Sequence, residues 1–112
     1  MNNIKMTIDE ILNDIGIPHK YLGRQYVTQC LLILFNSSSR LSNTAVYEQV
    51  ANMYNTTVDG VERNVRWCFT QLNYSNPVVS SLFKVSPRTG KVSVKEGLYS
   101  LLSELRFRHL NK

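Results

Sequence analysis

Apolar residues recur at helical spacing along most of the chain, and this pattern predicts an all-α protein. The clearest segment runs over residues 46–72, where Val46, Val50 and Tyr54 are spaced by four. After Asn55, a second apolar stripe follows at the same helical spacing: Val58, Val61, Val65, Cys68, Phe69 and Leu72. Asparagine tolerates the left-handed conformation that ends many helices, and Thr56 or Thr57 can cap the helix that follows. We therefore expect two helices that meet at a tight corner.

The corner has the steric pattern of a helix-turn-helix. Ala51 is small enough to let the second helix approach, Asn55 turns the chain, and Val61 packs back across the corner. The outer face of the second helix carries polar residues: Asp59, Glu62, Arg63, Arg66 and Thr70. Arginine can hold guanine through two hydrogen bonds, and glutamate can accept one from the cytosine amino group. On spacing alone, a helical hairpin with a solvated charged face fits equally well.

Four further helices complete the pattern. Thr7 to Glu10 form a capping box, and the short stripe that follows ends at Gly16. The apolar pattern of residues 19–36 predicts a long central helix, and Lys20, Arg24 and Gln25 are expected to form its hydrated side. Asn76-Pro77 begins a short helix, and a second capping box at Ser93 to Glu96 begins the last one. The prediction is one compact domain of about six helices over residues 7–112, preceded by a flexible arm of residues 1–6.

The segment before the last helix is basic. Ser86 to Lys91 form a turn that contains Arg88 and Lys91, with valines on both sides. A small winged-helix hairpin would make these two residues wing contacts, but its strands would be only about three residues long, at the lower limit of strand length. We therefore prefer an extended basic loop.

Charge separates the two halves of the chain. The net charge is +5: residues 1–62 hold four Lys/Arg against six Asp/Glu, and residues 63–112 hold nine against two. The basic half begins inside the second helix of the corner, which favours an anionic partner such as nucleic acid.

The sequence contains none of the usual signs of catalysis or membrane insertion. It has no glycine-rich phosphate loop, nucleophile elbow, or pair of Cys or His at metal-ligand spacing, so we expect no enzyme activity, metal or cofactor. Cys30 and Cys68 each lie in an apolar helical pattern and are expected to be buried thiols. No apolar run is long enough to span a bilayer, so we expect a cytoplasmic protein that is nucleoid-associated when bound to DNA.

These residues resemble the C-terminal effector domain of the sporulation response regulator, the stage zero sporulation protein A family. The resemblance is strongest in Asn55-Thr56-Thr57, Val61-Glu62-Arg63 and Arg66. It continues in Ile15-Gly16-Ile17-Pro18, Ser80-Ser81-Leu82-Phe83, Leu105-Arg106 and His109, and so covers nearly the whole chain from about Thr7 to His109.

The resemblance implies a bacterial DNA-binding regulator that reads a box written TGTCGAA. It implies base contacts by Glu62, Arg63 and Arg66 and a further DNA contact by Lys91. It also implies a surface for the RNA polymerase sigma factor at residues 73–85, and tandem dimers on adjacent boxes. To the base contacts we add predicted backbone or secondary contacts by Thr56, Thr57, Asp59, Arg88 and Lys91.

Two departures from the family bear on function. The family has an arginine where this chain has Gly60, which removes one expected DNA contact and places a glycine in a helix at a cost of about 1 kcal/mol relative to alanine. This sequence also lacks the family's receiver domain, so we expect either a cloned fragment or a stand-alone form. A stand-alone form could act constitutively or antagonise the full-length regulator.

Two functions therefore remain open. The first, which we favour, is a sequence-specific transcription regulator that reads double-stranded DNA through the major groove. The second is a protein-interaction module or antagonist that binds a sigma factor or a related regulator without strong DNA reading.

Overall fold

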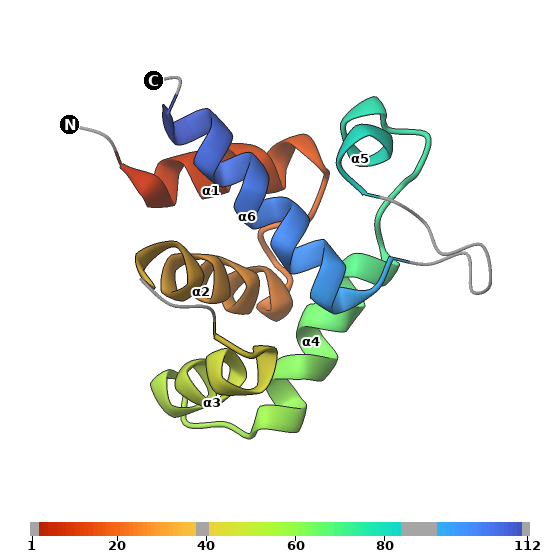
Figure 1. Cartoon of the computed structure of the whole chain (residues 1–112). Coiled ribbons are helices and arrows are strands. Elements are labelled where there is room, and N and C mark those ends of the chain that lie inside the picture. Colours follow the sequence, from red (N-terminus) through yellow and green to blue (C-terminus); the bar gives the residue numbers. More distant parts are fainter. Residues whose placement is uncertain (1–2, 38–40, 84–91, 111–112) are drawn as a thin grey trace.

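The computed structural model describes residues 3–37, 41–83 and 92–110, and the described part of the chain is all-α, as predicted. Its six helices are α1 (Ile4–Asp14), α2 (Leu22–Asn36), α3 (Asn43–Met53), α4 (Val58–Thr70), α5 (Pro77–Leu82) and α6 (Val94–Leu110). Figure 1 shows α1 and α6 on one side of α2, and the corner of α3 and α4 on the other. The basic loop with Arg88 and Lys91 lies outside the described residues, so the choice between hairpin and loop stays a prediction.

Helix α1 begins earlier than the sequence pattern predicted. Asn3 is its N-cap, with a side-chain oxygen that accepts from the Met6 N–H at 3.3 Å, so the predicted capping box at Thr7 is wrong. Thr7 instead lies inside the helix, fully buried. Because Ile4 to Met6 are helical, any N-terminal arm is shorter than the predicted residues 1–6.

The end of α1 follows the prediction for Gly16. This glycine has a φ of +82°, and the N–H of Ile17 donates to the Leu12 carbonyl at 3.0 Å. That combination is a Schellman motif, in which a left-handed residue stops the helix and satisfies its last carbonyl groups. Asn76 supports the same end from a distant part of the sequence: it caps α5 and its amide donates to the Asp14 carbonyl at 2.9 Å.

Arg24 corrects the predicted hydrated side of the central helix. The residue is only 3% exposed, although Lys20 and Gln25 are exposed as predicted. The guanidinium donates to the Ile17 carbonyl at 2.5 Å and to the side-chain oxygen of Asn13 at 3.0 Å, and it pairs with Asp9 at 3.5 Å. A buried charge requires such partners. Arg24 therefore joins α2 to α1 and to the turn between them.

Two glycines let neighbouring helices approach α4 closely. A Cβ at Gly23 of α2 would overlap the carbonyl oxygen of Asn64 and lie 2.6 Å from the Cys68 sulfur. A Cβ at Gly97 of α6 would overlap the ring of Phe69. Helix α4 is thus held by backbone-to-backbone contact on one side and by a ring-to-backbone contact on the other.

Both cysteines are free thiols in the core, as predicted. Burial raises the pKa of Cys30 to about 12 and that of Cys68 to about 11. Desolvation disfavours the thiolate, which is the reactive form. The described helices include none that is long and apolar enough to cross a membrane.

We predict that Gly23→Ala destabilises the protein. Alanine is the better helix former by about 1 kcal/mol. The backbone of Asn64 cannot move aside without separating α2 from α4, and forced overpacking of this kind costs about 1–3 kcal/mol. Because the overlap is with backbone atoms, the upper end of that cost applies, and we expect a net loss of about 2 kcal/mol in the free energy of unfolding, measured by urea denaturation. The exposed neighbour variant Gln25→Ala is the control, and equal stability of the two variants would refute the close-approach argument.

Candidate nucleic-acid interface

The corner between α3 and α4 is closed by hydrogen bonds around Asn55. Asn55 has a φ of +52°, the left-handed conformation that the sequence predicted for it. The N–H of Thr56 donates to the Ala51 carbonyl at 2.9 Å, and the N–H of Asn55 donates to the Asn52 carbonyl at 3.4 Å. This is again a Schellman motif. Ala51 and Val61 are both buried in the core on either side of the turn.

Helix α4 begins with a threonine cap. The Thr57 hydroxyl accepts from the N–H of Gly60 at 3.0 Å, which satisfies one of the free donors of the first turn. A Cβ at Gly60 would lie 3.1 Å from the hydroxyl oxygens of both Thr56 and Thr57. The glycine therefore lets two threonine hydroxyls pack against the start of the helix, and a larger residue here would displace them slightly.

The outer face of α4 presents the residues predicted to read bases. Arg63 is exposed and makes no hydrogen bond or ion pair with any other residue that the structure describes. Arg66 pairs with Glu62 one helical turn away, and their side chains are 56% and 39% exposed. An exposed pair of this kind is worth less than about 1 kcal/mol. Both side chains can therefore exchange this contact for one to a ligand at little cost.

The other predicted contacts divide into two groups. Thr56, Thr57 and Asp59 are exposed at the start of α4, directly after the turn at Asn55. Arg88 and Lys91 lie outside the described residues, so their placement relative to α4 stays a prediction.

Not all of the positive charge in the second half of the chain belongs to this face. Figure 1 places the C-terminal end of α6 far from the corner of α3 and α4. At that end Arg108 donates to Glu104 at 2.8 Å and to Asp14 at 2.9 Å, so its charge is used within the protein. Charge counting along the sequence therefore overstates the charge available next to α4.

The sequence reasoning missed Trp67. This residue is 52% exposed on α4, four positions after Arg63, and its ring lies 6.5 Å from that of Tyr21. The available signal was its spacing from Arg63, which places both on the same side of the helix.

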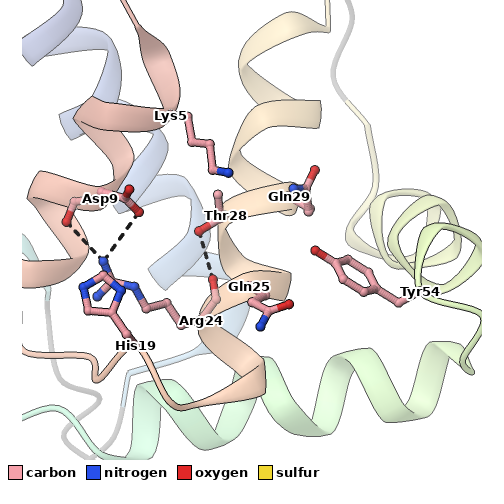
Figure 2. Close-up of a pocket in the computed structure, with 8 residues that line it drawn as sticks. All are labelled: Lys5, Asp9, His19, Arg24, Gln25, Thr28, Gln29 and Tyr54. Atoms are coloured by element: carbon pink, nitrogen blue, oxygen red, sulfur yellow. Dashed lines mark hydrogen bonds and ion pairs between the residues drawn. The ribbon is translucent and has the colours of Figure 1, made fainter.

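A polar cleft of about 350 Å³ is lined by residues of α1 and α2, by His19 between these helices, and by Tyr54 at the end of α3 (Figure 2). Its lining includes Lys5, Asp9, His19 and Arg24. Figure 2 shows the Arg24 guanidinium directed at Asp9, so these two charges neutralise each other and leave Lys5 as the remaining cation of the lining. The described residues contain no cluster of His, Cys, Asp or Glu that could hold a metal ion.

Most of the chain matches a known protein family. The model of the family described as "Sporulation initiation factor Spo0A C terminal" matches residues 8–97 of the 112-residue chain. The matched region contains α2 to α5 in full, including the whole corner and its outer face.

We predict that the corner depends on the left-handed conformation of Asn55. An alanine at this position incurs the steric cost of a left-handed residue, about 1–2 kcal/mol, whereas glycine does not. Asn55→Ala should therefore lower the free energy of unfolding by about 1 kcal/mol, and Asn55→Gly should retain it within about 0.5 kcal/mol. Urea denaturation measures both, with the exposed helical residue variant Asn52→Ala as the control. Equal effects of alanine and glycine at position 55 would contradict the argument.

Proposed function

The chain belongs to the Spo0A C-terminal family, and we propose that it reads a specific double-stranded DNA sequence with α4 in the major groove. The family is the DNA-binding effector domain of a sporulation regulator, so DNA-binding transcription regulation is its general function. The proposal concerns which residues read the DNA and which sequence they read.

The observation that carries the proposal is the state of the two arginines on α4. Arg63 is exposed with no partner among the described residues, and Arg66 has only an exposed ion pair. An arginine in this state has all or most of its donors available for guanine O6 and N7, while Glu62 can accept from a cytosine amino group. The TGTCGAA box contains a CG step that offers both kinds of partner. We propose this box as the target.

Gly60 should tune the binding. In the family an arginine occupies this position, at the start of the helix where phosphate groups would approach. Its replacement by glycine removes one cation but keeps the Thr57 cap intact, with the Gly60 N–H as the donor. We propose that this chain binds more weakly than a relative with arginine there, and that the reading residues keep the same positions.

Contacts outside α4 complete the proposal. Thr56, Thr57 and Asp59 would lie near the backbone at the helix start, and Arg88 and Lys91 would add phosphate or secondary contacts. Residues 73–85 would meet a sigma factor: the described part includes the exposed residues Asn73, Ser75 and Ser80. Two domains would sit in tandem on adjacent boxes.

We predict that Arg63→Ala and Arg66→Ala each weaken binding to a TGTCGAA duplex by about 1–3 kcal/mol, because each removes a bidentate base contact. Binding to a scrambled duplex should fall much less, so specificity relaxes. Lys91→Ala should weaken both duplexes more evenly, as expected for a phosphate contact. Fluorescence anisotropy of labelled duplexes at two salt concentrations measures these effects.

The matched control is Arg106→Ala, an exposed arginine near the C-terminal end of α6. Figure 1 places that end of the helix far from the corner. It should leave the preference for the box unchanged. If Arg63→Ala discriminated between the two duplexes as well as the unmodified protein does, α4 would not be the reading element. Equal weak binding of the unmodified protein to both duplexes would favour the protein-interaction module instead.

A further inference from the structure

We propose that Trp67 is an additional DNA contact, which binds apolar groups of the duplex beside the bases read by Arg63. This inference rests on the proposed function and extends it to a residue that neither the charge pattern nor the family resemblance singled out.

The position of Trp67 on α4 places it next to the reading residues. Four residues along an α-helix correspond to a rotation of about 40°, so Trp67 follows Arg63 on nearly the same side, one turn further on. The rest of that side is polar or charged: Asp59, Arg66 and Thr70. A large ring that is 52% exposed is the one extensive apolar surface on the outer face of this helix.

Tyr21 supports the tryptophan from one side. The two ring centroids are 6.5 Å apart and the planes are tilted by 56°, a common geometry for aromatic pairs. Tyr21 is the N-cap residue of α2, two residues before Gly23, whose backbone packs directly against Asn64 of α4. The close approach of the two helices therefore fixes Tyr21 beside Trp67. The indole is held in place on that side, and half of its surface stays open to solvent.

The chemistry of the duplex determines what an exposed indole could contact there. A helix in the major groove brings the residues beside its central reading residue close to base edges and to the sugar-phosphate backbone. The apolar groups available are the thymine methyl in the groove and the deoxyribose carbons of the backbone. Either group would cover the indole through an apolar contact that involves no charged group and releases no counterion. The contribution of Trp67 should therefore not depend on salt.

The fact that Trp67 is the only tryptophan makes a direct test available. Tryptophan emission, excited at the red edge of the absorption band where the six tyrosines barely absorb, then reports on this one ring. On titration with the TGTCGAA duplex, we expect the emission to change and the ring to become at least about threefold less accessible to acrylamide, in parallel with the anisotropy of the labelled duplex.

Variants test the energetic contribution. Trp67→Ala should weaken binding to the box about tenfold, as expected when a contact of some 50 Å² of apolar surface is lost. The slope of log affinity against log salt should stay the same, because no counterion release is removed. Trp67→Phe should keep most of the affinity. Phe107→Ala, which removes a 63% exposed aromatic ring from α6, is the matched control and should change nothing. Circular dichroism verifies that each variant is folded.

A duplex with uracil in place of thymine distinguishes the two apolar groups. If uracil weakens binding of the unmodified protein but not of Trp67→Ala, the contact is a thymine methyl. If Trp67→Ala weakens binding to both duplexes equally, the contact is deoxyribose. Binding seen by anisotropy with unchanged acrylamide quenching would overturn the inference and leave the proposed function intact. The absence of any duplex binding would overturn both.

Discussion

The arrangement of this domain depends on the contact between the backbones of α2 and α4 at Gly23. Because the glycine has no side chain, the central helix lies directly against the Asn64 carbonyl of α4. Gly97 allows a similar approach by α6, which packs on the ring of Phe69. Together with the packing of α3, these contacts bury one side of α4, with Val61, Val65 and Cys68 at 0% exposure. The direction in which the opposite side faces is thus set by the core and not by any residue on the outer face.

Because the buried side of α4 provides its stability, the outer side can carry charged residues that lack buried partners. Its capping, its Schellman corner and its buried stripe provide the stability, so Arg63 needs no internal partner and Arg66 has only an exposed one. Arg24 contrasts with these two exposed arginines. Its guanidinium is buried, and carbonyl, amide and carboxylate oxygens of α1 and the following turn satisfy it. The exposed arginines are available to a ligand, whereas Arg24 is part of the structure.

Most of the fold could be predicted from the sequence, because the apolar spacing and the residues at the helix ends indicate the same helices. The left-handed Asn55 and Gly16, the Thr57 cap and the start of α5 at Pro77 are local features, and local chemistry determines them. The errors arose where tertiary contacts decide. Thr7 looked like a cap, but Asn3 caps the helix and the core buries the threonine. Arg24 looked like a solvated residue because its partners on α1 and in the following turn lie 7 to 15 positions away. The outer face was predicted by charge, so uncharged Trp67 was missed.

The charges of α4 bear on how affinity and specificity would be divided in the proposed complex with DNA. Asp59 and Glu62 balance Arg63 and Arg66, so this helix carries no net charge. Its attraction to a polyanion is therefore weak until the side chains meet partners of the right geometry, since only directional contacts can favour one base sequence over another. General attraction must come from cations elsewhere in the chain, and Lys84, Arg88 and Lys91 are the nearest group in the sequence. If α4 reads DNA as we propose, a helix that is neutral overall gains little electrostatic attraction from binding the wrong sequence.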